Sequence, residues 1–281
     1  MTDPWPLVGL AGGALLAGML GTVAPRAAPR RLVKENRSGR AVPVVLGMCL
    51  VSAFLLVVPV IAETTKAELG WVGLVELAAV LGLAVVGLLD DLFGEAPRGF
   101  RGHLGALRRV RVTTGTVKLI AGLGAALALA LAMGGQPIRA VGATVLVAAA
   151  TNLWNALDVV PGRALKWAIL ALASVLAAGW TGPAAVPAGT ALGAAVGSLP
   201  HDLGERAMLG DCGSNPLGFL CGAGLAVVLP TAGLLVAAGT ALLLQVAAET
   251  VTISRLIDAV PPVRWFDRLG RRAEAGAPKA G

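Results

Sequence analysis

The chain has 281 residues, of which 56% are hydrophobic and only 14% are charged. A soluble domain needs far more polar surface than this, so water is excluded as the main solvent. The net charge of +7 does not indicate nucleic acid, because the basic residues stand in short loops between apolar blocks rather than on one aromatic-rich face. We therefore predict a membrane protein whose partners are lipid headgroups and anionic substrates, with no nucleic acid.

Apolar blocks recur along the chain at about the 20-residue length that crosses ~30 Å of hydrocarbon. They predict helices, because a membrane barrel would show ~10-residue segments of alternating polarity. The fold class is therefore an all-α polytopic membrane protein. We predict about nine transmembrane helices, at 5–24, 42–62, 70–89, 113–133, 139–157, 166–181, 184–199, 216–230 and 232–249.

The distribution of Lys and Arg predicts the orientation of these helices. With the N-terminus outside, 21 of the 23 basic residues fall in cytoplasmic loops or the C-terminal tail, and only Lys66 and Arg139 fall outside. Cytoplasmic loops of membrane proteins retain positive charge. We expect the N-terminus outside and the C-terminus in the cytoplasm, in the inner (plasma) membrane.

No polar stretch is long enough for a soluble domain, so we expect a single transmembrane domain over 1–272. Within it, 250–272 carries an apolar helical stripe followed by basic residues interleaved with Trp265 and Phe266, which predicts a segment along the cytoplasmic interface. Residues 273–281 are expected to be a disordered tail. The first apolar block follows Asp3 and no basic residue, which disfavours a cleaved signal peptide.

Asp90 and Asp91 close the third predicted span, in the string VVGLLDDLFGE. Neighbouring carboxylates repel each other unless they share a cation or a proton. A pair at this position therefore indicates a metal site or proton transfer, with simple solvation of the helix end as the alternative.

Asn152, Asn155 and Asp158 follow at a spacing of three near the end of the fifth span. This spacing places them near one face of a helix. Amides that donate and accept, together with a carboxylate that accepts from a ring N–H, suit the edge of a pyrimidine base. Hydrogen bonding between spans is the alternative.

Asp211 lies in MLGDCGSNPLGF, between the seventh and eighth predicted spans. Free N–H groups around Gly213 and Ser214 could hold a phosphate, while Asp211 could give Mg²⁺ an oxygen ligand. An ordinary turn with a helix cap is the alternative. Lys118, near the start of the fourth span, could neutralise a diphosphate or simply extend to the membrane interface.

The charge count places these carboxylates, the amides and Lys118 on the same, cytoplasmic side of the membrane. Carboxylates, a lysine and a glycine-containing turn together fit Mg²⁺-assisted phosphoryl transfer, in which the metal ion neutralises oxygens and the protein positions the reactants.

Three motifs carry a resemblance to a known family. GLLDDLFG, TNLWNALDVVPG and MLGDCGSNPLGF resemble, in order, the motifs of the polyprenyl-phosphate N-acetylhexosamine-1-phosphate transferases. That family includes the phospho-N-acetylmuramoyl-pentapeptide transferase and the UDP-GlcNAc:undecaprenyl-phosphate GlcNAc-1-phosphate transferase. The resemblance implies transfer of a sugar 1-phosphate from a UDP-sugar to a polyprenyl phosphate, with release of UMP, in cell-envelope glycan synthesis.

The resemblance also implies roles for particular residues. Asp211 would bind Mg²⁺, with Mn²⁺ as a substitute, and Asp90 would be the base toward the lipid phosphate with Asp91 beside it. TTGTVKL resembles the segment that carries a family lysine, which implies an active-site role for Lys118. Asn155 and Asp158 would help to bind the uridine. A homodimer is compatible with this interpretation.

Two departures from the family pattern motivate a second hypothesis. Pro161 stands where the family has a second aspartate, and the histidine-rich stretch after the ninth span is missing. Arg163 is a candidate replacement contact to phosphate. The second hypothesis is a relative that has lost catalysis and serves as a lipid-binding or scaffolding protein. A third, a proton-coupled transporter, would need acidic residues near the midplane and inverted repeats, which the sequence does not show.

Overall fold

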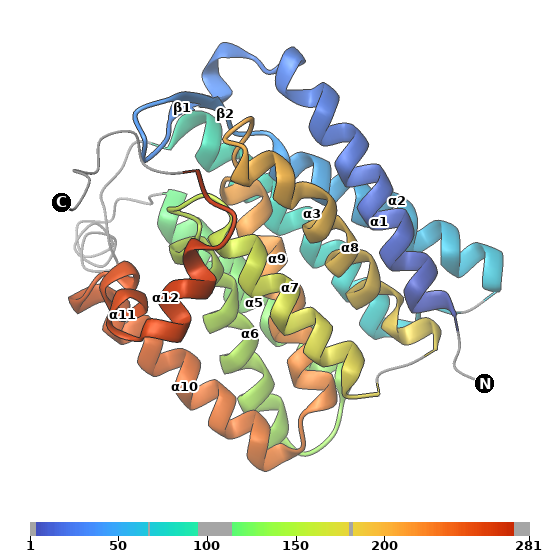
Figure 1. The fold of residues 1–281 in the computed structure, drawn as a ribbon. Coiled ribbons are helices and arrows are strands. Elements are labelled where there is room, and N and C mark those ends of the chain that lie inside the picture. The colour runs from blue at the N-terminus through green and yellow to red at the C-terminus, as the bar shows by residue number, and fades with distance from the viewer. Residues whose placement is uncertain (1–3, 67, 95–113, 180–181, 273–281) are drawn as a thin grey trace.

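The computed structural model describes residues 4–66, 68–94, 114–179 and 182–272. In these ranges the chain forms a bundle of helices with a two-stranded hairpin at one end (Figure 1). The long helices are α1 (Trp5–Val23), α2 (Leu46–Thr65), α3 (Gly70–Phe93), α5 (Thr114–Met133), α6 (Pro137–Leu157), α7 (Arg163–Ala177), α8 (Val186–Leu203), α9 (Asp211–Val228) and α10 (Thr231–Thr250).

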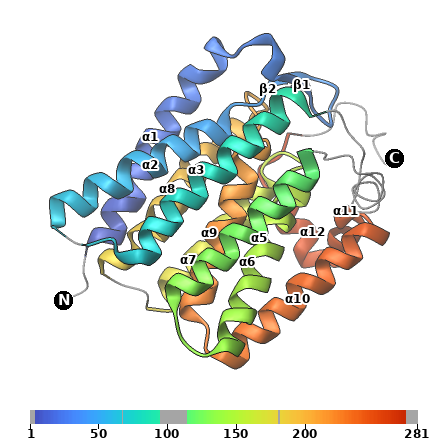
Figure 2. The same cartoon turned by 180° about the vertical axis from the view of Figure 1, so that it is seen from behind.

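The shorter elements lie mostly near the hairpin end of the bundle. They are the 3₁₀ turns Ala24–Ala27, Arg30–Leu32 and Pro183–Ala185, the strands β1 (Val33–Glu35) and β2 (Ala41–Pro43), and the helices α11 (Ile253–Ala259) and α12 (Pro261–Arg268). The two strands pair antiparallel, with Val33 opposite Pro43. Figure 2 shows from behind that α10 leads into α11 and α12 along one side of the bundle.

Six helices of the described chain, α1, α2, α3, α5, α6 and α10, are long and apolar enough to cross a membrane. The fold is therefore compatible with the predicted multi-pass, all-α membrane protein. The spans predicted at 166–181, 184–199 and 216–230 are also helical, as α7, α8 and α9, but they do not belong to these six. The count of nine and the orientation stay predictions, and the tail at 273–281 lies outside the described residues.

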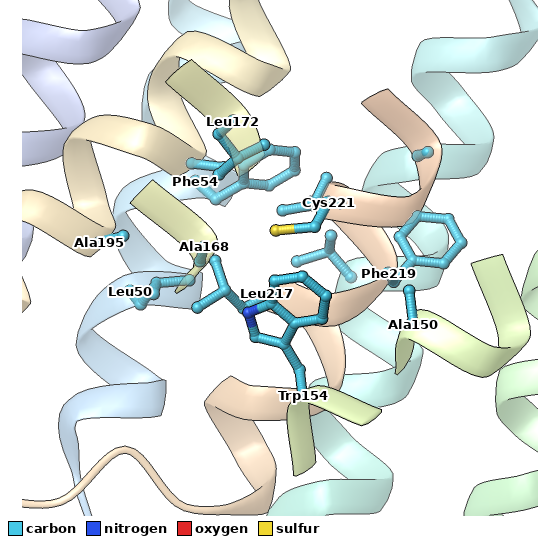
Figure 3. Close-up of a cluster of buried hydrophobic side chains, with 14 of the residues drawn as sticks. Leu50, Phe54, Ala150, Trp154, Ala168, Leu172, Ala195, Leu217, Phe219 and Cys221 are labelled. Atoms are coloured by element: carbon cyan, nitrogen blue, oxygen red, sulfur yellow. The ribbon is translucent and has the colours of Figure 1, made fainter. Parts of the chain in front are cut away.

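Helix α9 forms the centre of the hydrophobic core. Every residue from Cys212 to Gly224 is buried, which is the pattern of a helix enclosed on all sides by protein. Figure 3 shows Leu217, Phe219 and Cys221 of α9 among side chains of the surrounding helices, labelled Leu50, Phe54, Ala150, Trp154, Ala168, Leu172 and Ala195. This packing fixes the position of α9, and therefore of Asp211 at its first turn.

Helices α1 and α8 approach each other closely through small residues. Gly189, Gly193 and Gly197 repeat every fourth residue along one face of α8. A Cβ atom on Gly193 would lie 2.0 Å from the carbonyl oxygen of Leu10, and the other two glycines face α1 carbonyl oxygens at 2.2 and 2.3 Å. Such small-residue faces let helix backbones pack against each other in membrane proteins.

We expect Gly193→Ala to lower the stability of the protein by about 1–3 kcal/mol, because its methyl group overlaps the backbone of α1. Gly82→Ala on α3 is the matched control, since a Cβ there meets no atom within 4 Å. Thermal unfolding of both variants in the same detergent checks this. Equal melting temperatures for the two variants would contradict the close α1–α8 packing.

Candidate active site

The hairpin is tied to the segment that precedes α9. The side-chain Oδ1 of Asn36 accepts the backbone N–H groups of Ser38 and Arg40 at 3.0 and 2.9 Å, which shapes the turn between β1 and β2. The N–H of Met208 donates to the carbonyl of Pro43 in β2 at 2.8 Å. At the start of α2, the N–H groups of Leu46 and Gly47 donate to the carbonyls of Met208 and Leu209, both at 3.0 Å. The hairpin and the start of α9 are therefore held in one fixed arrangement.

Lys118 joins two aspartates that come from different helices. Its Nζ lies 2.6 Å from Oδ2 of Asp90, at the end of α3, and it also forms an ion pair with Asp211, the first residue of α9. All three side chains are about 20% exposed, between 19% and 20%, so they reach solvent while being largely enclosed. The structure thus brings together three residues that were predicted to share a site.

Asp91 points away from Lys118, because successive residues of a helix differ in direction by about 100°. It is 6% exposed, and its Oδ2 accepts the backbone N–H of Cys212 at 3.0 Å. Lys34 of the hairpin lies 3.4 Å from its Oδ1. Asp91 therefore caps the N-terminus of α9 from a neighbouring helix, where a negative charge also favours the helix dipole.

Asp158 holds the same turn from the other side. Its Oδ2 accepts the backbone N–H of Gly210 at 2.9 Å. Burial and the nearby carboxylates of Asp202 and Asp211 raise the pKa of Asp158 well above its ordinary value, although the Gly210 hydrogen bond opposes this. The Asp158 carboxylate therefore carries an electrostatic cost that a bound cation would reduce.

A cavity of ≈450 Å³ opens between the hairpin and these carboxylates. Its acidic lining residues are Glu35, Asp91, Asp158, Asp202 and Asp211, and its basic ones are Lys34 and Arg37, both from the hairpin. The carboxylates of this cavity could bind a cation or the edge of a base. Its ammonium and guanidinium groups could bind phosphates. Lys34 and Arg37 were not predicted as site residues; their sequence signal was their place in a basic loop that was predicted to be cytoplasmic.

The loop from α6 to α7 forms another wall of the cavity. Val159, Val160 and Pro161 line it. Gly162, at φ +74°, donates its N–H to Oδ2 of Asp202 at 2.7 Å. Asp202 is a buried residue near the end of α8. It follows that a carboxylate from another helix holds the loop in which Pro161 stands.

Four other residues that were predicted to bind substrate lie outside the cavity or have their N–H groups already hydrogen-bonded. Asn152 and Asn155 are partly buried on α6 and do not line the cavity. The N–H groups of Gly213 and Ser214 both donate to the carbonyl of Gly210, at 3.1 and 2.9 Å, and a Cβ on Gly213 would lie 2.5 Å from Cα of Gly47. These N–H groups are engaged in the first turn of α9, so the expectation of free donors for phosphate was wrong.

Arg163 is also engaged elsewhere. Its Nε and one terminal nitrogen donate to the two carboxylate oxygens of Asp267 in α12, at 2.8 and 3.0 Å, and the other donates to Ser254 at 3.0 Å. Lys166, one helical turn later, donates to carbonyl oxygens of α12 and the residues after it. Arg163 therefore fastens the C-terminal segment to α7, and the predicted phosphate contact is replaced by this ion pair.

The sequence predicts Mg²⁺ at Asp211. Among the described residues, no group of three or more His, Cys, Asp or Glu side chains is arranged to hold a metal ion. Mg²⁺ is, however, commonly held by one or two carboxylates together with water and substrate phosphates. Asp90 and Asp211, which converge on a single Lys118 ammonium, fit that kind of site.

Comparison with known proteins assigns no family: the chain matches no protein-family model and none of the curated proteins.

We expect Asp158→Asn to raise the melting temperature, and the gain to grow with pH. The folded pKa of Asp158 is raised. The wild type therefore loses stability as the pH rises from the unfolded pKa of ~3.9 toward that higher value. Asparagine can still accept the Gly210 N–H. Melting curves of both proteins at several pH values, with EDTA present, measure the difference between their melting temperatures. A difference that does not change with pH would argue against an electrostatically destabilised carboxylate at position 158.

The C-terminal segment gives a matched pair of tests. Asp267 is 4% exposed in its pair with Arg163, and breaking one partner of a buried pair costs about 3–5 kcal/mol. Asp258 pairs with Arg268 at the exposed surface, where such pairs contribute about 0–1 kcal/mol. We expect Asp267→Asn to speed proteolysis after Thr250 and lower the melting temperature, and Asp258→Asn to change neither. Equal behaviour of the two variants would refute the fastening role of Arg163.

Proposed function

We propose that the protein transfers a sugar 1-phosphate, of the N-acetylhexosamine type, from a UDP-sugar to a polyprenyl phosphate at the cytoplasmic face of the inner membrane. The observation that carries the proposal is the ion-paired group of Asp90, Lys118 and Asp211, beside a cavity with both acidic and basic walls. These residues come from three helices and from the motifs that resemble the polyprenyl-phosphate sugar-1-phosphate transferases.

The basic residues suit a substrate that carries a diphosphate. Lys118 can exchange part of its contact with Asp90 and Asp211 for oxygens of the diphosphate. Lys34 and Arg37 of the hairpin line the cavity that Asp211 also lines. Asp158 and Asp202 line the same cavity, and their carboxylates can accept N–H or O–H groups of a nucleoside. The cavity volume of ≈450 Å³ is within the usual range for small-molecule sites.

In the proposed reaction, an oxygen of the lipid phosphate attacks the phosphorus that carries the sugar. A new P–O bond forms, the bond between that phosphorus and the UMP oxygen breaks, and UMP leaves with its electron pair. Asp90 accepts the proton of the acceptor phosphate where it is protonated. Lys118 holds the phosphate oxygens in line. When bound at Asp211, Mg²⁺ supplies further neutralisation of charge on the transferring group.

An apolar cavity of ≈350 Å³ supports a lipid acceptor. It is lined by apolar side chains of α6, α7, α10, α11 and α12, which are Leu153, Trp154, Leu157, Trp167, Leu244, Ile253, Leu256, Ile257 and Val263. Leu157 is the immediate neighbour of Asp158, which lines the polar cavity. A hydrocarbon chain in the apolar cavity would therefore bring its phosphate toward the charged residues.

A lipid-binding protein without catalysis is the second candidate. It is favoured by one observation: Asp91 and Asp158 both accept backbone N–H groups at the start of α9. Two of the carboxylates that were predicted to be functional therefore stabilise the fold. Binding of UDP-sugar or polyprenyl phosphate without UMP release would support this candidate.

The purified protein, supplied with undecaprenyl phosphate, Mg²⁺ and a panel of UDP-sugars, is expected to release UMP and form a lipid-linked sugar. Asp211→Asn is expected to reduce the rate by about 100-fold or more, because the affected charge lies at the reacting phosphates. Asp258→Asn, on the exposed side of α11, is the matched control and should leave the rate unchanged. If the wild type gives no product with any of the UDP-sugars, or Asp211→Asn is fully active, the proposal fails.

A further inference from the structure

A second charged cavity lies at the opposite end of the bundle from Asp90 and Asp211. Its volume is ≈380 Å³, and it lies where the ends of α2, α3, α8 and α9 meet. In the described part of the chain, it shares no lining residue with the polar cavity described above. Glu76, which lines it, precedes Asp90 on α3 by 14 residues, or about 21 Å along the helix at 1.5 Å per residue. The two cavities are therefore separate sites.

Glu76 is the unusual residue of this cavity. It lies within the candidate span α3 and is 3% exposed. No ion pair or hydrogen bond to its carboxylate is found within the described ranges. A carboxylate inside a membrane span is costly and normally has a partner. Glu76 therefore indicates a ligand that would complete the site.

Among the residues that the structure describes, Arg139 is the one basic residue that lines the cavity, and its guanidinium group already has hydrogen-bond partners. Its two terminal nitrogens donate to the carbonyl oxygens of Leu229 and Ala226 at 2.9 and 2.7 Å. These carbonyls belong to the C-terminal end of α9, where a positive charge offsets the negative end of the helix dipole. Glu68, an exposed residue, adds a second carboxylate to the lining. The cavity thus favours a cation.

Apart from Thr65, the rest of the wall is apolar, with Val58, Ile61, Val72, Met133, Val186 and Val227 among its residues. We propose that the cavity binds an ammonium group carried on an apolar chain, with the positive nitrogen against the Glu76 carboxylate. The apolar walls would enclose the chain, and the volume is within the usual range for such ligands. A lipid with an ethanolamine headgroup and a free lipophilic amine share this chemistry.

The direct test uses decyltrimethylammonium as the probe, with the purified full chain in maltoside micelles and bound probe counted by native mass spectrometry. We expect saturable binding of one probe per chain. Glu76→Gln should weaken it at least about tenfold, because an ion pair to a buried charge is lost. Glu63→Gln is the matched control: Glu63 is exposed, pairs with Lys66 and does not line this cavity. It should bind the probe like the wild type.

Two comparisons on the wild type keep the proposal testable if Glu76→Gln does not fold. Decanol and decyl sulfate carry the same chain with a neutral and a negative headgroup, and both should bind at least about tenfold more weakly. Equal binding of all three, or equal binding by folded Glu76→Gln, would show that the cavity selects apolar chains alone and would overturn the proposal.

Nanodiscs distinguish the two sources of the ammonium group. In phosphatidylglycerol discs that also contain phosphatidylethanolamine, retention of the latter by the wild type, and its displacement by the probe, would identify a lipid. Binding of the probe with no ethanolamine lipid retained would identify a free amine. Both outcomes support an ammonium site, and neither depends on the proposed transferase activity, which can be assayed separately on the same protein.

Discussion

At the start of α9, the carboxylates of Asp91 and Asp158 accept the backbone N–H groups of Cys212 and Gly210. These groups would otherwise be unpaired inside the bundle, where an unsatisfied donor is costly. The two hydrogen bonds bind the ends of α3 and α6 to α9. Through them, Asp211 stands beside Lys118 and Asp90. The hairpin lies against the same turn, because the carbonyl of Pro43 accepts the N–H of Met208.

This arrangement concentrates negative charge. Asp90, Asp91, Asp158, Asp202 and Asp211 all lie near one cavity, with Lys118 and Lys34 as the cations in direct contact with them. Burial raises the pKa of Asp158, and repulsion from the nearby carboxylates of Asp202 and Asp211 raises it further, because like charges in a low-dielectric region repel each other strongly. A protein selected for stability alone would have little reason to retain such a cluster. Such a cluster is expected where a cation and a charged substrate bind, because carboxylates with strongly shifted pKa values are common at functional sites.

Much of this arrangement could be predicted from the sequence. The apolar blocks predicted the helices because their length is set by the bilayer, and the motif positions predicted that Asp90, Lys118 and Asp211 would meet. The directions of side chains could not be predicted. Asp90 and Asp91 are adjacent in sequence, yet one faces Lys118 and the other caps α9, since that depends on the rotation of α3 against its neighbours. Arg163 was predicted to contact phosphate, whereas its partner is Asp267. That residue lies 104 residues further along the chain, and no local sequence pattern indicates that the segment around it packs against α7.

The central claim is that the charged group around Asp211 binds a divalent cation together with a UDP-sugar. Electron paramagnetic resonance of Mn²⁺ tests it directly, because the free ion gives a strong signal that is lost on binding. With UDP-N-acetylglucosamine present, we expect the wild type to remove about one Mn²⁺ per chain from the free signal, in keeping with cation sites completed by substrate phosphates. Asp211→Asn should remove far less. If the two proteins remove equal amounts, or neither removes any, the cluster is not a metal-assisted phosphoryl-transfer site.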